Sequence, residues 1–164
     1  MTSHTTRTFG PPFGTFTATI TDTPTGPALA RLAFGGEPDA KPIPEPHAAL
    51  AELVWTRLET YFAGRGLETD DLPLVMDAPP FTRRVRERMR AIPFGQTETY
   101  GSIAAELGSP GAGRAVGNAC RTNPIPIFVP CHRVLDASGK LHGYAGGLAL
   151  KAALLDCENI AVCV

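Results

Sequence analysis

The stretch Asn123-Pro-Ile-Pro-Ile-Phe-Val-Pro-Cys-His-Arg-Val134 is the most informative part of this 164-residue sequence. Its prolines and β-branched residues predict a rigid, extended segment that presents Cys131 at its end. A cysteine attacks as its thiolate, and a nearby imidazole favours that form. Adjacent side chains of an extended chain point apart, so Cys131 and His132 interact only if the backbone turns directly after Cys131, or through a water. A Cys-His dipeptide alone does not identify a site.

Immediately upstream, the sequence predicts two short helices joined by a tight turn. One helix is expected over 101–107, Gly108-Ser-Pro-Gly111 is a turn, and a helix rich in alanine and glycine follows over 113–121. This is a helix-turn-helix pattern, whose second helix can approach a nucleic-acid surface closely. Small residues also serve tight packing between helices, so both interpretations stay open.

Further upstream, an apolar stripe predicts another helix. The residues of the stripe are Phe81, Val85, Met89 and Ile92. Arg83, Arg86 and Arg90 lie on another face, either as phosphate contacts or as a solvated surface. Ten basic and six acidic residues give the part over 79–164 a net charge of +4, whereas the part over 1–78 has −5. The asymmetry favours an anionic partner for the C-terminal part, first of all nucleic acid.

The N-terminal part predicts a hairpin followed by a helix. Threonines alternate with apolar residues over 13–22, as in a half-buried strand, and a second strand is expected over 28–34. After a loop over 35–46, apolar residues recur at helical spacing over 47–63. Trp55 is expected in or beside the core.

Composition places the chain among folded proteins, with 43% hydrophobic and 19% charged residues. An acidic, then proline-rich stretch over 67–80 predicts a linker between domains 1–77 and 78–164. No run approaches the roughly 18 apolar residues that span a bilayer, and no secretory signal is evident. We therefore expect a soluble, cytoplasmic protein without a membrane partner.

The cysteines and histidines do not form a metal-binding pattern. The four cysteines are Cys120, Cys131, Cys157 and Cys163. They contain no CxxC pair, and the histidines do not lie near them at zinc spacings, so no metal site is expected. Cys157 and Cys163 are interpreted as structural or incidental.

Several motifs together resemble the O6-alkylguanine-DNA alkyltransferases, which repair methylated guanine. The most specific is Pro130-Cys-His-Arg-Val134. The others, in chain order, are Tyr61-Phe-Ala-Gly-Arg65, Leu72-Pro-Leu74, Phe81-Thr-Arg-Arg-Val85, Ile92-Pro-Phe-Gly-Gln-Thr-Glu-Thr-Tyr100, Arg114-Ala-Val-Gly-Asn118, Asn123-Pro124, Gly143-Tyr-Ala-Gly-Gly-Leu148, Lys151 and Glu158. The resemblance covers residues 47–160 well and the N-terminal hairpin loosely.

The resemblance implies a set of catalytic residues. Cys131 would accept the alkyl group, His132 would be its general base through a water, and Glu158 would orient His132. Tyr100 would push the 3′ phosphate and donate a proton to guanine N3. Asn123 would be a hinge beside the active-site turn.

It also implies a substrate pocket and a DNA-binding surface. The residues expected to enclose the guanine and its alkyl group are Cys120, Val134, Tyr144, Ala145 and Gly146. The residues expected to meet DNA are Thr82, Ala112, Arg114, Ala115, Gly117 and Arg121. Arg114 would enter the duplex and fill the gap that the flipped nucleotide leaves.

The implied fold is α+β. A small N-terminal antiparallel sheet with a helix would form a ribonuclease-H-like lobe, and the C-terminal lobe would be mostly helical and winged-helix-like, with the helix-turn-helix. The implied activity is direct-reversal repair by a monomer without a cofactor: one alkyl group passes from O6-alkylguanine, and from O4-alkylthymine, in double-stranded DNA to Cys131.

The sequence departs from the family pattern at several positions. Ala145 stands where many relatives have a serine, and Cys120 where a bulkier apolar residue is common, which together would widen the pocket. Arg86 stands where relatives usually have tryptophan and is expected to weaken packing. Thr82 replaces a frequent glutamine, and its hydroxyl could still donate a hydrogen bond to a DNA phosphate.

Three other functions were weighed against alkyl transfer. An alkyltransferase-like protein that only binds lesions usually lacks the cysteine, and Cys131 is present. A redox-sensing transcription regulator would need a dimer segment, which is not evident. A cysteine hydrolase would need an oxyanion hole or a protease motif, and neither accompanies Cys131.

Overall fold

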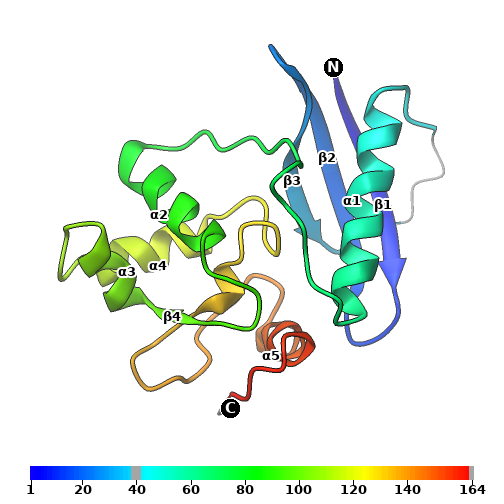
Figure 1. Ribbon diagram of the computed structural model, residues 1–164. Helices are drawn as coiled ribbons and strands as arrows, with labels where there is room; N and C mark the ends of the chain where they lie inside the picture. Colours follow the sequence, from blue (N-terminus) through cyan, green and yellow to red (C-terminus); the bar gives the residue numbers. More distant parts are fainter. Residues whose placement is uncertain (38–41, 163–164) are drawn as a thin grey trace. The chain divides into compact units, whose positions relative to one another are not determined.

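The computed structural model describes residues 1–37 and 42–162. Part of the loop predicted over 35–46, and Cys163, therefore lie outside the described residues. The chain forms two compact units, Met1–Val75 and Met76–Val164, and the boundary that the sequence predicted lies two residues further along. Secondary structure is α+β, as the sequence predicted (Figure 1). No helix in the described part of the chain is long and apolar enough to cross a membrane.

The first unit contains a three-stranded antiparallel sheet with β2 in the middle (Figure 1). The strands are β1 (Thr2–Phe9), β2 (Gly14–Thr23) and β3 (Gly26–Phe34). The predicted hairpin corresponds to β2 and β3, whose register shifts between Thr19 and Ile20. Residues 73–75 continue beside β3, where Leu29 N–H donates to Pro73 O (2.8 Å). The predicted linker is thus partly fixed to the sheet.

Strand β1 was not predicted, because almost all of its residues are polar and it therefore shows no alternation of polar and apolar positions. Every second partner of β1 in β2 is a threonine, and three pairs of hydroxyls meet across the two strands. These pairs are Thr2–Thr21 (3.1 Å), Thr6–Thr17 (3.0 Å) and Thr8–Thr15 (2.8 Å). Threonine is favoured in strands, and such cross-strand pairs stabilise a sheet without an apolar stripe.

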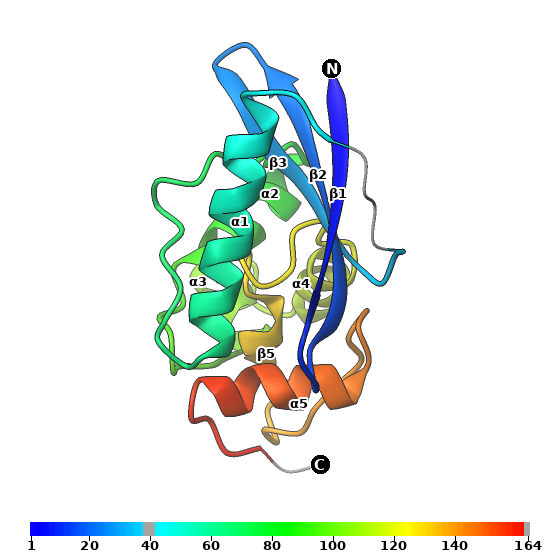
Figure 2. The ribbon, with the colours of Figure 1, turned by 90° about the vertical axis from the view of Figure 1, so that its right-hand side faces the viewer.

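Helix α1 (His47–Phe62) runs along one face of this sheet and contacts all three strands (Figure 2). Phe16, Ala18 and Ile20 alternate along β2 with the threonines and are fully buried. The buried residues of α1 recur every three or four positions and include Leu50, Val54, Trp55, Leu58 and Tyr61. Trp55 therefore lies in the core, as predicted.

The first residue of α1, His47, is completely buried and joins three elements. Its Nδ1 lies 2.8 Å from Ser3 Oγ of β1, and its Nε2 lies 2.9 Å from Asp22 Oδ1 of β2. A buried imidazole needs such partners, since an unpaired buried polar group is unfavourable. His47 thus ties the start of α1 to the sheet.

We expect His47→Ala to lower the free energy of unfolding of the first unit by about 1 to 3 kcal/mol, because Ser3 Oγ loses its buried partner. The matched control is His4→Ala, since His4 is exposed and contacts Thr19 Oγ1 on the surface. Urea unfolding followed by fluorescence of Trp55, the single tryptophan, measures both. Equal losses would show that His47 has no special role.

The second unit holds the remaining elements (Figure 1). They are α2 (Pro80–Arg90), β4 (Glu98–Thr99), α3 (Tyr100–Glu106), α4 (Gly113–Arg121), a 3-10 turn η1 (Cys131–Arg133), β5 (Val134–Leu135) and α5 (Leu148–Cys157). The three helices predicted here are α2, α3 and α4, within one or two residues of their expected ends. The parallel pair β4–β5 is too short for a sequence pattern to predict it.

Local sequence explains where α3 begins and ends. Thr99 caps the helix: its Oγ1 accepts from Ser102 N–H, and Ser102 Oγ accepts from Thr99 N–H. After Leu107, Gly108 adopts a positive φ of 74°, which suits glycine at a helix end. Helices α3 and α4 then pack against each other. The helix-turn-helix, winged-helix and ribonuclease-H-like interpretations stay predictions.

Candidate active site

The segment before Cys131 is held in shape by the side chain of Asn123. Asn123 Nδ2 donates to Val129 O (2.8 Å), and its Oδ1 accepts from Ile125 N–H (3.1 Å). Cys131 N–H donates to the same Val129 O (2.8 Å). The whole run 125–134 is buried. Asn123 thus closes a loop whose far end carries the thiol.

The backbone turns directly at Cys131, which meets the condition set by the sequence. Residues Cys131–Arg133 form η1 instead of continuing the extended segment. His132 is completely buried, and its Nε2 lies 2.5 Å from Glu158 Oε2 at the end of α5. Two of the predicted catalytic residues, 26 positions apart, are therefore in direct contact.

Glu158 is the centre of a buried network. Its Oε1 accepts from Arg133 Nε (2.8 Å) and from Gly95 N–H (2.9 Å). Arg133 in turn donates through Nη1 to Ile92 O (2.8 Å), just after α2. Only 3% of Glu158 and 5% of Arg133 are exposed. Arg133 and Gly95 were not predicted as site residues, although both lie in motifs that carry the resemblance.

Burial sets the charge of the two central groups. It lowers the pKa of His132, although the Glu158 carboxylate opposes that shift. It raises the pKa of the Cys131 thiol, against the hydrogen bond from Asn123 and the positive charge of Lys151. At neutral pH the resting site therefore holds a thiol and a neutral imidazole. Because Glu158 is a hydrogen-bond acceptor, the imidazole proton lies on Nε2 and the basic lone pair on Nδ1.

Several predicted site residues lie within electrostatic range of Cys131. The pKa values of Tyr100 and of Cys120 are each raised to about 12, chiefly by burial and to a smaller extent by a negative charge on Cys131. The pKa of Tyr144 is also raised by burial and by the charge of Cys131. Val134 directly follows η1 and is fully buried. The structure thus brings residues of α3, α4 and the loop before α5 around one thiol.

Lys151 of α5 holds that loop in place. Its buried Nζ donates to Val134 O and to His142 O, each at 3.2 Å. The two carbonyls lie at either end of a loop in which Asp136 Oδ1 accepts from Ser138 N–H (2.9 Å) and Lys140 N–H (3.0 Å). The sequence assigned no such part to Lys151.

This loop leads to three of the predicted pocket residues, Tyr144, exposed Ala145 and half-buried Gly146.

The residues predicted to meet DNA divide into two groups. Arg114, Ala115 and Arg121 are exposed on α4. Ala112 and Gly117, and Thr82 near the start of α2, are half-buried. A Cβ on Gly117 would lie 3.9 Å from the ring of Tyr100. The small residues of α4 therefore serve the packing of α3 on one side and leave an arginine-bearing surface on the other.

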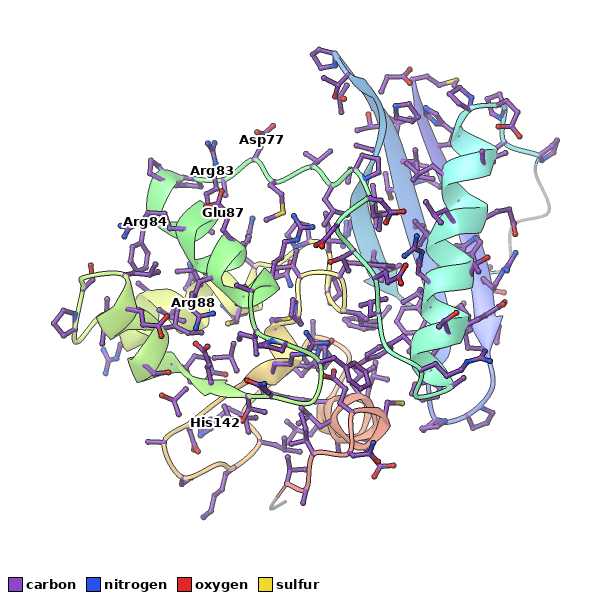
Figure 3. All side chains as sticks on the ribbon, in the orientation of Figure 1. Asp77, Arg83, Arg84, Glu87, Arg88 and His142 are labelled. Carbon is purple, nitrogen blue, oxygen red and sulfur yellow. The ribbon has the colours of Figure 1, made fainter. Side chains whose placement is uncertain are left out.

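Arg86 does not lie on a solvated surface, so that interpretation is wrong for this residue. Only 6% of it is exposed, because it lies between Val85 and Met89 on the buried side of α2. Its Nη2 donates to Thr122 O (2.9 Å) and Oγ1 (3.2 Å). Arg83, by contrast, is exposed near the start of α2 (Figure 3).

Comparisons with known proteins show the family of this chain. The family model described as "6-O-methylguanine DNA methyltransferase, DNA binding domain" matches residues 80–160. The methylated-DNA–protein-cysteine methyltransferase of Mycobacterium leprae is 48% identical over 117 residues, which cover 71% of this chain and 69% of that protein. This chain belongs to the methylated-DNA–protein-cysteine methyltransferase family.

Further members of the family are also similar to this chain. The one from Mycobacterium bovis is 51% identical over 103 residues, 63% of this chain, and the match spans 62% of that protein's length. A variant of the Mycobacterium tuberculosis O6-methylguanine methyltransferase has a similar structure, with a TM-score of 0.77 and 38% identity over 96% of this chain and 93% of that chain. Mycobacterium tuberculosis OGT in complex with DNA gives a TM-score of 0.74 and 39% identity, over 94% and 91% of the two chains.

The Glu158 network makes a stability prediction. We expect Arg133→Met to destabilise the second unit by about 3 to 5 kcal/mol, because the mutation leaves a buried carboxylate without its cation. Arg84→Met is the matched control: Arg84 is exposed and donates to Leu107 O, so its loss is expected to change stability by less than about 0.5 kcal/mol.

Native-state hydrogen exchange measures this effect within the second unit. Peptides over 92–95 and α5 should lose protection in Arg133→Met and keep it in Arg84→Met. Unchanged protection in Arg133→Met would contradict the role given to the Glu158–Arg133 pair.

Proposed function

We propose that this protein repairs DNA by transferring the alkyl group of O6-alkylguanine, or O4-alkylthymine, to Cys131, once per molecule. The observation that carries the proposal is the buried contact between His132 and Glu158, next to Cys131 in the same turn. Its relatives are named methylated-DNA–protein-cysteine methyltransferases, and one related structure contains DNA. Double-stranded DNA is the proposed partner of a monomeric protein that needs no cofactor.

The proposed transfer is a single displacement at carbon. The thiol proton of Cys131 passes to His132 Nδ1 through a water, and Glu158 stabilises the imidazolium that forms. The sulfur electron pair then attacks the alkyl carbon, the C–O6 bond breaks, and its electrons enter the guanine ring. Tyr100, kept protonated by its raised pKa of about 12, donates a proton to guanine N3. The imidazolium proton then returns to Tyr100. Overall, one proton leaves the thiol and one proton is added to guanine.

The product explains the single turnover. A thioether on Cys131 is a poor leaving group, and the proposed mechanism includes no group that removes it. The substrate would be held by backbone groups of Cys131 and Val134 and by the loop Tyr144–Gly147, with Asn123 as the hinge of the turn. Cys120 and Ala145 would face the alkyl group and leave room for substituents larger than methyl.

The exposed side of α4 is the proposed DNA-binding surface. Arg114 would fill the gap of the extruded nucleotide, a step that costs a few kcal/mol in stacking. Ala112, Ala115 and Gly117 permit close approach to the minor groove, while Arg121 and Thr82 would bind phosphates. Such binding depends on salt and only weakly on sequence.

We expect intact-protein mass to rise by one methylene on incubation with a duplex containing one O6-methylguanine, and to saturate at one per protein. Cys131→Ala should abolish the gain yet keep binding to the duplex, whereas Cys157→Ala, at a half-buried thiol of α5, should leave it unchanged. Transfer by Cys131→Ala would refute the nucleophile. Binding without transfer by the unmutated protein would indicate a lesion-binding protein.

Arg114→Ala should slow repair of duplex DNA at least about tenfold, because extrusion loses its replacement for stacking. Reaction with free O6-benzylguanine, which needs no extrusion, should change little. Arg65→Ala, at an exposed arginine of the first unit, serves as the control. Equal losses on both substrates would remove the proposed role of Arg114.

A further inference from the structure

Arg86 is a buried cation for which the described residues provide no carboxylate. Its only hydrogen bonds within the described chain go from Nη2 to Thr122, and its buried Nε has no acceptor there. Burial lowers its pKa, and the thiolate form of Cys120 or Cys131 would act in the opposite direction. A buried, incompletely paired charge is unfavourable for stability. Packing alone therefore does not account for an arginine at this position.

A short chain of hydrogen bonds leads from Arg86 to the thiol. Thr122 is the C-cap of α4, and its Oγ1 also donates to Asn118 O (2.8 Å). The next residue is Asn123, whose Nδ2 donates to Val129 O, the same carbonyl that accepts from Cys131 N–H. By holding Thr122 from α2, Arg86 fixes the starting point of the loop that presents Cys131.

The positive charge of Arg86 also acts on the thiol. Among the charges that lower the pKa of Cys131 against burial, Arg86 follows Lys151. The other groups that interact with Cys131 come from three helices and two loops: they are Lys151 of α5, Cys120 of α4, Tyr100 of α3, and Asn123 and Tyr144 of the loops. Only Lys151 among these is a cation, so Arg86 is a second positive charge that favours the thiolate.

We propose that Arg86 is a positioning residue for the reaction of Cys131: its hydrogen bonds to Thr122 fix the turn that presents the thiol, and its guanidinium adds a buried positive charge to the site. This deepens the proposed function, because alkyl transfer requires the Cys131 thiolate. Thiol reactivity is measurable without DNA, so the two proposals fail separately.

The test is the pH profile of iodoacetamide alkylation of the folded protein. The thiolate displaces iodide and forms a carbon–sulfur bond, and peptide mass spectrometry reads Cys131 separately from Cys120 and Cys157. The variants are Arg86→Gln, which is neutral but keeps a donor, and Arg86→Lys, which keeps the charge. Arg86→Trp is a second neutral variant and keeps the test open if Arg86→Gln does not fold. Arg83→Gln, on the exposed side of α2, is the control.

We expect the neutral variants to displace the Cys131 profile by roughly 0.5 to 1 pH unit toward alkaline pH, which is about three- to tenfold slower alkylation at fixed pH. Arg86→Lys and Arg83→Gln should remain close to the unmutated protein. The proposal is overturned if a folded neutral variant keeps the original profile, or if Arg86→Lys shifts as far as Arg86→Gln. If these shifts hold but no alkyl group is taken from O6-methylguanine DNA, the proposed function fails and the positioning role stands.

Discussion

The second unit depends on one buried carboxylate, Glu158. Three parts of the chain meet at its two oxygens: η1 through His132 and Arg133, the segment after α2 through Gly95, and α5, which ends beside it. Removing a charge from water is unfavourable by several kcal/mol unless hydrogen bonds and a counter-charge replace the lost hydration. Here Arg133 supplies the charge, and the Gly95 N–H and the imidazole supply hydrogen bonds. The same carboxylate therefore stabilises the fold and orients His132.

This arrangement favours uncharged groups in the resting site. Burial raises the pKa of Cys131 and lowers that of His132, so both neutral forms are favoured at neutral pH. The protein still holds what a thiolate requires: a base with its lone pair on Nδ1, and two buried cations, Lys151 and Arg86.

The elements predicted from sequence were those with a clear apolar period, together with α3 and α4, which a glycine- and proline-containing turn separates. Helix α1 and strands β2 and β3 have one, because each buries a single face. Strand β1 has none, since its partners are threonine hydroxyls, and no pattern within Thr2–Phe9 shows that Thr15–Thr21 will lie opposite. The short pair β4–β5 exists only because distant residues are brought together by the rest of the unit.

The motif resemblance implied the chemistry of the site. The contacts that hold the site residues in place join residues far apart in the sequence, and no sequence pattern predicts them. Nothing local connects Arg133 with Glu158, 25 positions away, or Arg86 with Thr122, 36 positions away. Arg86 illustrates the limit most clearly. Helical periodicity placed it with two other arginines, but the close packing of α2 against α4 buries it.

The central claim is that Glu158 fixes His132 as a neutral base, and the protonation state of His132 tests it most directly. Nitrogen-15 NMR of the imidazoles, assigned by loss of one signal pair in His132→Gln, distinguishes the two tautomers and the cation. The account predicts a neutral ring at pH 7 with its proton on Nε2, titrating only below the ordinary histidine value of 6.5. An imidazolium at pH 7, or a proton on Nδ1, would contradict it.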